Sequence, residues 1–487
     1  MKDSMNKPIL FFLVSCLLLI TEITANTPES QEKQPNILFF LVDDMGWMDV
    51  AYNGSSVYET PNIDKLATES IEFTNAYVTH PRCVPSRYSI LTGKYPARIK
   101  RPGPGKMKLE EFTIAEALKE TGYATFFTGK WHLSMGGASM PDNQGFDVNI
   151  GGGKAGAPIS YFYPYNEPPH HQFKVPILGL EEGEEGEYLS DRLTRETINC
   201  IEKHVDAMPD VPFFAMLSHY AVHEPIEAKE EDVNYYQRKI EKHTFEHPEY
   251  LKESHGLSKM RQDNATYAGM VKSVDESLQQ VMLALEEMNI ADNTIIVFFS
   301  DNGGLSNTGT EERLLATSNY PLRAGKGHLY EGGVRVPLLI KWPQKQKRGT
   351  SSDAVITGAD LYPTLLEMVG VDLLPQQHLD GVSFKCLFDN QSNPAPDRSI
   401  FWHNAMARPV RTGDYYSSAV RKGPYKLIDF YKKGYMELYN LENDPKEENN
   451  LIETHAYIAD SLKKEIIDWR VSVDAYFKPD NKKSKWD

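Results

Sequence analysis

The sequence predicts an α/β fold in which a mostly parallel, doubly wound sheet is flanked by helices, followed by a smaller C-terminal α+β subdomain that contains an antiparallel sheet. Three observations lead to this prediction. Continuous apolar runs of strand length alternate with helical patterns as far as about residue 380. These runs show no polar alternation, as expected for parallel strands that are covered on both faces. Beyond that point, short alternating stretches rich in Tyr and Lys replace them.

The expected strands of the large sheet share one property, because polar or charged residues follow directly after most of them. We expect these strands at residues 36–42, 123–128, 212–217, 294–299 and 336–340. The first four lead, in order, to Asp43-Asp44, to Lys130 and His132, to His219 and His223, and to Asp301-Asn302. Ligand sites of doubly wound sheets gather beyond the carboxyl ends of the strands, so the pattern predicts one shared site.

Apolar periodicity and glycine stop signals place the helices. Gly122 and Gly370 end two of these patterns. In the large domain we expect helices at residues 114–120, at about 264–288 and at 361–369. In the C-terminal subdomain we expect strands at residues 415–420, 425–430 and 437–441 and a helix at about 456–473.

Length and charge restrict the class of protein. A chain of 487 residues is long enough to form one large α/β domain and a second, smaller domain. A chain of this length does not need disulfide bonds for stability. It contains 52 Lys and Arg residues against 68 Asp and Glu residues, a net charge of -16. Such an acidic chain does not suit a general binder of nucleic acid or of anionic membranes. If its substrate is an anion, positive charge must be concentrated in a pocket.

The N-terminus has the pattern of an export signal, predicted at residues 1–25. Lys2 and Lys7 precede an apolar run, residues 8–20, which is too short to span a membrane, so we expect no transmembrane span. Cleavage near Ala25 competes with lipidation of Cys16, which ends a lipoprotein-like Leu-Val-Ser-Cys string. We therefore expect an exported protein of a bacterium, either periplasmic, secreted or a cell-surface lipoprotein.

Four cysteines are present, at positions 16, 83, 200 and 386. Cys200 and Cys386 could pair, although free buried thiols are the favoured interpretation for both. The sequence has no C-x-x-C motif and no His-rich cluster that would indicate zinc.

The stretch from Cys83 to Gly93 predicts a short helix with a sulfur at its N-terminus. Pro85 suits the first turn and Gly93 the end. Unpaired N-H groups and partial positive charge at that terminus favour an anion, and the guanidinium group of Arg87 matches tetrahedral oxyanions. Cys83 is then either a structural cysteine or a nucleophile.

Three further segments suggest ligands of a charged site. Asp43, Asp44, Asp301 and Asn302 offer hard oxygen atoms that suit calcium, with magnesium as the second choice, whereas a solvated turn is the alternative for adjacent aspartates. The segment 325–337 has four glycines in a nine-residue window, which permit close backbone approach to a ligand, and we expect Lys326 there to be exposed and mobile.

These segments resemble the type I sulfatases, in particular bacterial polysaccharide sulfatases. Cys83-Val84-Pro85-Ser86-Arg87 with the following L-T-G resembles the signature in which the cysteine is oxidised to formylglycine (3-oxoalanine). Residues 325–337 resemble the family's G-K-G-x-x-Y-E-G-G-x-R-x-P segment, and residues 437–451 resemble a segment near the C-terminus of many sulfatases. The resemblance implies an alkaline-phosphatase-like sulfatase fold, with a catalytic domain at residues 34–380 and a C-terminal subdomain at 381–487.

The resemblance also implies roles for single residues. One Ca²⁺ per chain is held by Asp43, Asp44, Cys83, Asp301 and Asn302. A hydroxyl of the hydrated aldehyde at position 83, made more acidic by calcium and Arg87, attacks sulfur, and the second hydroxyl expels sulfate. Lys130 and Lys326 bind sulfate oxygens, His132 is the base of the elimination, and His223 protonates the leaving oxygen, with His219 as its alternative. Substrate contacts are expected from His219, Arg323, His403, Arg408 and the loop 161–171.

The implied function is hydrolysis of sulfate esters on a carbohydrate such as ulvan, carrageenan or a glycosaminoglycan. Its expected partners are that sulfated carbohydrate and a maturation enzyme, either formylglycine-generating or anaerobic sulfatase-maturating. Two alternatives remain open. One is a phosphodiester or phosphonate monoester hydrolase, because phosphate and sulfate share geometry. The other is a non-catalytic binder of sulfated glycans, if Cys83 is not matured.

Overall fold

The computed structural model describes residues 33–99, 107–134, 139–165, 177–253, 256–345, 348–389 and 391–479. Gln34–Asp487 form one compact unit. The expected leader at residues 1–25, with Cys16, and part of the loop 161–171 lie outside the described residues. Among the described helices, none has the length and apolar character that a membrane crossing requires.

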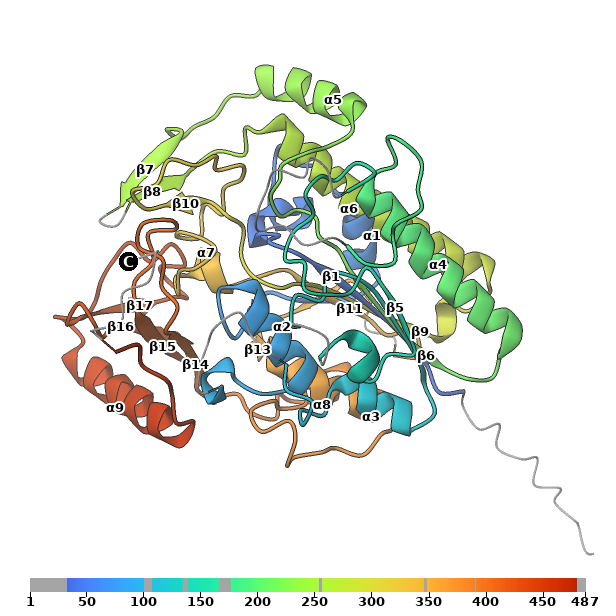
Figure 1. Ribbon diagram of the computed structural model, residues 1–487. Helices are drawn as coiled ribbons and strands as arrows, with labels where there is room; N and C mark the ends of the chain where they lie inside the picture. Colours follow the sequence, from blue (N-terminus) through green and yellow to red (C-terminus); the bar gives the residue numbers. More distant parts are fainter. Residues whose placement is uncertain are drawn as a thin grey trace, which may run out of the picture. The chain divides into compact units, whose positions relative to one another are not determined.

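An eight-stranded sheet forms the centre of the compact unit (Figure 1). Its strand order is β12-β2-β11-β9-β1-β6-β4-β5, and only the pairings of β11 with its two neighbours are antiparallel. The strands are β1 (Asn36–Val42), β2 (Ile71–Phe73), β4 (Ala124–Gly129), β5 (Val148–Ile150), β6 (Phe213–Ser218), β9 (Thr294–Ser300), β11 (Leu338–Lys341) and β12 (Thr350–Ser352). The mostly parallel sheet is thus confirmed, and its three-residue strands are those that the sequence did not predict.

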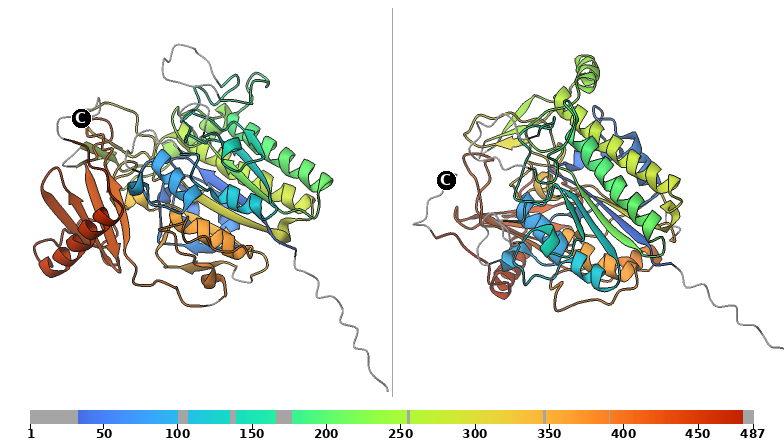
Figure 2. Two further views of the ribbon diagram at one scale, coloured as in Figure 1. Left: turned by 60° about the horizontal axis from the view of Figure 1, so that its bottom comes forward. Right: turned by 45° about the vertical axis from the view of Figure 1, so that its right-hand side comes forward.

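Helices cover both faces of this sheet (Figure 2). One face packs against α1 (Pro61–Thr68), α4 (Leu189–Ala207) and α6 (Ala265–Glu287), with α5 (Glu230–Glu241) beside α6. The other face packs against α2 (Cys83–Thr92), α3 (Ile114–Glu120) and α8 (Leu361–Met368). The helices predicted from glycine stops are present, whereas α1, α4 and α5 were not predicted.

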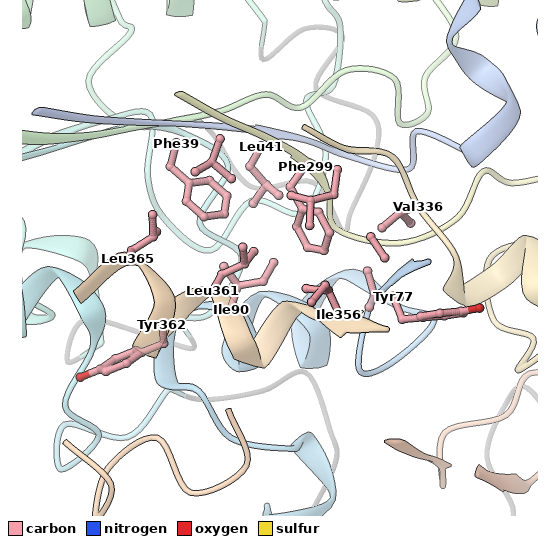
Figure 3. Packing of buried hydrophobic residues seen from close by; sticks show 14 of the residues in the cluster. Phe39, Leu41, Tyr77, Ile90, Phe299, Val336, Ile356, Leu361, Tyr362 and Leu365 are labelled. Carbon is pink, nitrogen blue, oxygen red and sulfur yellow. The ribbon is translucent and has the colours of Figure 1, made fainter. Parts of the chain in front are cut away.

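The strand β1 contributes to both hydrophobic cores because its successive side chains point to opposite faces. Leu38 and Phe40 belong to the core under α4 and α6. Phe39 and Leu41 lie on the other face, where Ile90 of α2 and residues of α8 approach them (Figure 3). A strand that is buried on both faces can place only its ends in contact with a ligand, which is why the polar residues after β1 matter for function.

The C-terminal part is a four-stranded antiparallel sheet with one helix. Its order is β14-β15-β16-β17, and α9 packs on one face through a separate apolar cluster. The elements are β14 (Ile400–Asn404), β15 (Ser417–Lys422), β16 (Tyr425–Phe430), β17 (Tyr435–Asn440) and α9 (Ala456–Ser472). The antiparallel sheet agrees with the prediction, although β14 was not expected. The domain boundary at residue 380 stays a prediction, because Gln34–Asp487 form a single compact unit.

Short elements complete the described fold. The strands β7 (Tyr250–Glu253), β8 (Gly256–Lys259) and β10 (Asn307–Thr308) form a small sheet, and β3 (Ala76–Tyr77) pairs with β13 (Ile356–Thr357). The helix α7 (Glu331–Val334) is a single turn that follows the glycine-rich segment. Cys200 and Cys386 are free and half-buried, so the two thiols do not pair.

A buried charge cluster fastens the C-terminal sheet to the glycine-rich segment. Lys426 of β16 lies 2.8 Å from Glu331 Oε1 and 3.1 Å from Glu447 Oε1, and all three side chains are fully buried. The backbone N-H of Glu331 donates to Glu447 Oε2 at 2.6 Å. Since Glu331 belongs to α7, this cluster fixes the position of α7 against β16.

We predict that Lys426→Met destabilises the fold, because two buried carboxylates lose its ammonium group and only Arg335, 3.8 Å from Glu331, stays near them. Removal of one partner of a buried ion pair costs about 3–5 kcal/mol. Chemical denaturation should show this loss in the free energy of unfolding. The matched control is Lys422→Met on β15, whose partner Glu465 is partly exposed, and for which we expect a loss of at most about 1 kcal/mol. Equal losses for the two variants would contradict the importance of the buried cluster.

Candidate functional site

Four neighbouring strands deliver polar residues to one point at the edge of the large sheet. Asp43 and Asp44 follow β1, Lys130 follows β4, Ser218 ends β6, and Asp301 follows β9. Backbone hydrogen bonds continue between the strand ends, from Lys130 N to Ser218 O at 2.7 Å and from Asp301 N to Val42 O at 3.0 Å. The parallel arrangement therefore brings together groups that lie up to 258 positions apart in the chain.

The acidic side chains form a compact group with Cys83. Ligand atoms of Asp43, Asp44, Cys83 and Asp301 all lie within 4.8 Å of one another, and all four residues are buried. Asn302 joins this group, since its Nδ2 donates to Asp44 Oδ1 at 2.7 Å. Oδ1 of Asn302 and Oδ1 of Asp43 are buried and accept no hydrogen bond from the described residues. Unsatisfied oxygens in a buried carboxylate group fit the binding of a hard cation.

Three cationic side chains balance the carboxylates. Lys130 Nζ donates to Asp43, Lys326 Nζ lies 2.6 Å from Asp44 Oδ1, and Arg87 Nε donates to Asp301 Oδ2 at 2.7 Å. Lys326 is only 8% exposed. The expectation that Lys326 is exposed and mobile is thus wrong, because Asp44 binds its ammonium group with both carboxylate oxygens.

The pKa values of the acids reflect this balance. Burial opposes the ionisation of Asp44, but Lys326 and His223 outweigh it and hold the pKa of Asp44 below its ordinary value. Burial and the neighbouring Asp43 raise the pKa of Asp301 to about 6. Lys326 keeps a raised pKa, because the attraction of Asp44 exceeds the cost of burial. The site therefore retains charges of both signs in a buried environment.

Cys83 occupies the first position of α2, directly after the cap residue Arg82. Gly93 ends the helix at φ +66°, as the sequence predicts. The thiol lies 3.7 Å from Asp44 Oδ1 and is 5% exposed. Burial raises the pKa of Cys83 to about 12. A thiol in this state is protonated at neutral pH, so an unmodified Cys83 is a poor nucleophile.

Arg87 connects the helix to three strand ends. Besides Asp301, it binds the carbonyl oxygen of Lys130 at 2.7 Å and Ser218 Oγ at 2.6 Å, both from Nη1. The second terminal nitrogen, Nη2, lies 3.7 Å from Asp43 Oδ1. The planar guanidinium group thus fixes the distance between α2 and the edge of the sheet. Ser218 was not predicted as a site residue, because it belongs to no sequence motif.

Two histidines lie at this site. His223 Nε2 is 3.7 Å from Asp44 Oδ2, and its Nδ1 is 2.8 Å from the carbonyl oxygen of Glu224. His132 adopts a left-handed backbone with φ +60°, and its Nδ1 is buried without a hydrogen-bond partner among the described residues. Burial lowers the pKa of both rings, with Lys326 adding to the effect at His223 and Lys130 at His132. Both histidines are neutral at pH 7 in this state.

Three of the expected substrate contacts lie elsewhere. His219 is fully buried, with Nε2 2.8 Å from Ser277 Oγ of α6 and its ring 5.0 Å from that of Phe40. The chain turns its side chain into the core, so His219 is neither a substrate contact nor an alternative to His223.

His403 and Arg323 are also structural. Ring nitrogens of His403 lie 2.7 Å from Ser418 Oγ and 2.7 Å from Tyr476 O, which fixes the ring inside the C-terminal part. Arg323 pairs with Glu253 at 2.8 Å and stacks 4.1 Å from the ring centre of Tyr330. Neither residue contributes to the candidate site, whereas Arg408 lies close enough to Cys83 for the two to influence each other electrostatically.

A separate cavity of about 230 Å³ lies away from these groups and is lined mainly by β7, β8 and the segment around Arg323. Its lining includes neither the clustered carboxylates, Asp43, Asp44 and Asp301, nor their partners Lys130 and Lys326. A narrow crevice of about 10 Å³, lined by Asp44, Val222, Glu224 and Tyr267 among others, adjoins the site itself. We assign the function to the charged group and not to the larger cavity, because chemistry requires the converging polar atoms.

Comparisons with known proteins point to one family. A family model described as sulfatase matches residues 35–371, and a model of the C-terminal part of N-sulphoglucosamine sulphohydrolase matches residues 324–472. Arylsulfatase J of Mus musculus is 30% identical over 365 residues, 72% of this chain and 54% of that protein, so the chain spans about half the length of this relative. A sulfatase of Formosa agariphila is 30% identical over 89% of this chain and 88% of its own.

A solved structure supports the fold. The crystal structure of Ps i-CgsB in complex with k-i-k-neocarrahexaose has 31% sequence identity to this chain and a TM-score of 0.74. The match covers 92% of this chain and 95% of that one. The sheet, the flanking helices and the C-terminal antiparallel sheet thus correspond to a known architecture.

We predict that Arg87→Lys destabilises the fold although it keeps the charge. The lysine cannot bind Asp301, Ser218 and the Lys130 carbonyl oxygen together, and hydrogen bonds of charged groups contribute about 1.5–3 kcal/mol each. We expect a loss of about 2–4 kcal/mol in the free energy of unfolding, measured by denaturation. Ser218→Ala, which removes one acceptor, is the control and should cost about 1 kcal/mol. A loss below that of the control would show that the guanidinium group does not hold the strand ends together.

Proposed function

The chain belongs to the sulfatase family, and on this premise we propose that it is an exported, calcium-dependent enzyme that removes sulfate from a sulfated oligo- or polysaccharide. Hydrolysis of sulfate esters follows from the family. The carbohydrate is proposed because the related solved structure was determined with a neocarrahexaose. The observation that carries the proposal is Cys83, placed at a helix N-terminus among three carboxylates and three cations.

Calcium is proposed to bind to Asp43, Asp44, Asp301 and Asn302, together with residue 83. The unsatisfied Oδ1 atoms of Asp43 and Asn302 support this set, and all its oxygens are hard ligands. When bound, a divalent cation neutralises sulfate oxygens and makes a nearby hydroxyl more acidic. The carboxylates would then be shared with the metal, and Lys130 and Lys326 would become available to an anionic substrate.

Residue 83 is proposed to act as formylglycine and not as a thiol. The raised pKa of the Cys83 thiol supports this, because a buried, protonated thiol attacks sulfur poorly. The hydrated aldehyde supplies a hydroxyl nucleophile and a route for release of sulfate. An exported chain would meet its maturation enzyme, either formylglycine-generating or anaerobic sulfatase-maturating, before or during export.

The surrounding residues are proposed to hold the sulfate group and to move protons. Arg87, Lys130 and Lys326 present positive charge around position 83, where the negative charge of a sulfate ester has to be neutralised. His132 is the proposed base and His223 the proposed acid for the leaving alcohol. His223 is neutral in the free enzyme, because burial and Lys326 lower its pKa. A bound anion would raise that pKa and thus favour the protonated form that the acid requires.

We predict that Cys83→Ala abolishes turnover and leaves the fold intact. Loss of a nucleophile should lower kcat by about 10³-fold or more. Release of inorganic sulfate from an aryl sulfate measures this, and thermal unfolding verifies the fold. Mass spectrometry of the peptide that contains residue 83 should show the aldehyde in active wild-type protein. Retained activity in the variant would refute the assignment. Faster hydrolysis of an aryl phosphate diester than of the aryl sulfate would favour a phosphodiesterase.

We also predict that Asp301→Asn weakens calcium binding, because it removes a negative charge from the group around position 83. Titration calorimetry on metal-free protein should give an affinity reduced by about 10-fold or more, which corresponds to about 1.4 kcal/mol. Asp275→Asn is the control, since Asp275 is buried but binds Asn62 and the backbone of Ile63 outside the site. Unchanged calcium affinity in Asp301→Asn, or full wild-type activity in excess chelator, would contradict the metal site.

A further inference from the structure

A loop of the C-terminal part is attached to both sides of the candidate site. It comprises residues 405–414, between β14 and β15. Arg82, the residue before Cys83, donates to Asp414 Oδ1 at 2.7 Å, and both side chains are almost fully buried. This contact fixes the loop to the N-terminus of α2.

The same loop is attached to the glycine-rich segment next to Lys326. His328 Nε2 lies 2.8 Å from the carbonyl oxygen of Thr412 in the loop. Asn404, which ends β14 directly before the loop, donates to the carbonyl oxygen of Gly327 at 3.0 Å. The loop therefore bridges the residues that follow Lys326 and the residue that precedes Cys83. Buried contacts on two sides thus hold the loop next to the site.

This loop carries two arginines in one tight turn. The carbonyl oxygen of Arg408 accepts backbone N-H bonds from Arg411 at 3.1 Å, from Thr412 at 2.9 Å and from Gly413 at 3.2 Å. Arg408 and Arg411 thus leave the same turn, and each is partly exposed. Two guanidinium groups that start this close together repel each other unless negative charge lies near them.

The far end of Arg411 reaches the residue next to His223. Its Nη2 lies 3.9 Å from Glu224 Oε2, and Arg313 Nη2 binds the same oxygen at 2.5 Å. The side chains of Arg411 and Glu224 are each 34% exposed, so this contact is partly open to solvent beside His223. The arginines consequently line a path from Cys83 towards His223.

Several guanidinium groups gather along this path, although the whole chain has a net charge of -16. Arg82 pairs with Asp414, and Arg313 and Arg411 both lie near Glu224. Burial lowers the pKa of Arg408 to about 10, and the repulsion from Arg82 and Arg411 adds to this effect. A guanidinium group in this position gains stability from a bound anion.

A histidine beside this path also has unused hydrogen-bonding capacity. His80 is 2% exposed, and neither of its ring nitrogens has a hydrogen-bond partner among the described residues. Arg82, Asp414 and Arg408 are among the groups that influence its charge, so it lies close to the arginine turn. Buried polar atoms of this kind need a partner, and an oxygen-rich group near the turn would supply one.

We propose that Arg408 and Arg411 form a second anion subsite, which binds an additional acidic group of the same substrate while the scissile sulfate lies at residue 83. This proposal rests on the proposed function and narrows its substrate class. The substrate is a carbohydrate with at least two anionic groups, the second being a sulfate or a uronate carboxylate. Arg313 holds Glu224 and thereby shapes the outer border of this subsite.

The test measures binding to full-length, calcium-loaded Cys83→Ala protein by calorimetry, so that turnover is not required. The sulfate probes are two pairs: glucosamine 6-O-sulfate with glucosamine 2-N,6-O-disulfate, and N-acetylgalactosamine 6-sulfate with the 4,6-disulfate. The carboxylate probe is a uronate-N-acetylgalactosamine 6-sulfate disaccharide, paired with its methyl ester. In at least one pair, the compound with two anionic groups should bind about 10-fold more tightly.

The arginines are then changed in the same background. Arg408→Gln and Arg411→Gln should each reduce this ratio of affinities to about 3-fold or less, and Arg411→Lys should restore part of it. Arg238→Gln, on the exposed side of α5, is the control and should keep the full ratio. Thermal unfolding measures the stability of each variant, and the Arg411 variants decide the result if Arg408→Gln does not fold.

Several results would contradict the proposal of a second anion subsite. These are equal affinities within every pair, a ratio that survives both substitutions, a ratio that Arg238→Gln reduces equally, or no detectable binding of any probe. Failure of the proposed function is a different result, because it appears as a mature wild-type enzyme that releases no sulfate from an aryl sulfate. The ratio of affinities tests the proposed subsite whether or not the wild-type enzyme releases sulfate.

Discussion

The attraction between three buried carboxylates and three cations is the interaction on which the rest of the site depends. Asp43, Asp44 and Asp301 meet because the strands β1 and β9 are parallel neighbours. Like charges at this separation repel strongly in a buried environment. Arg87, Lys130 and Lys326 compensate that repulsion, and each comes from a different part of the chain. The fold therefore brings together a charged group that no local segment could form, and it is this group that we propose to bind both a metal and an anion.

The elements that were predicted correctly are those whose structure is encoded in a local sequence pattern. Uninterrupted apolar runs located β1, β4, β6 and β9, because strands that are buried on both faces leave this trace. Strands of three residues, such as β2 and β5, leave no such trace. The ends of long strands were also informative, since residues after parallel strands must meet at one edge. The resemblance to a family supplied the roles of these residues, which spacing alone could not give.

The direction in which a side chain points could not be predicted from the sequence. His219 and His223 follow the same strand, yet His219 turns into the core towards Ser277 and His223 turns towards Asp44. Lys326 lies in a glycine-rich segment and was expected to be mobile, but an acid 282 positions away binds it. Arg82 and Arg313 have no motif, and their importance depends on Asp414 and Glu224. Such long-range pairs become visible only when the chain is folded.

The buried cluster of Lys426, Glu331 and Glu447 has a consequence for how this architecture can vary between related chains. Lys426 and Glu447 come from the C-terminal part, whereas Glu331 belongs to the part of the chain that carries the candidate site. A hybrid that joins this part to a foreign C-terminal part without a matching lysine would leave the buried Glu331 with Arg335, at 3.8 Å, as its remaining described cation. Exchange of the C-terminal part is therefore expected to cost stability unless the incoming part supplies a cation at the position of Lys426.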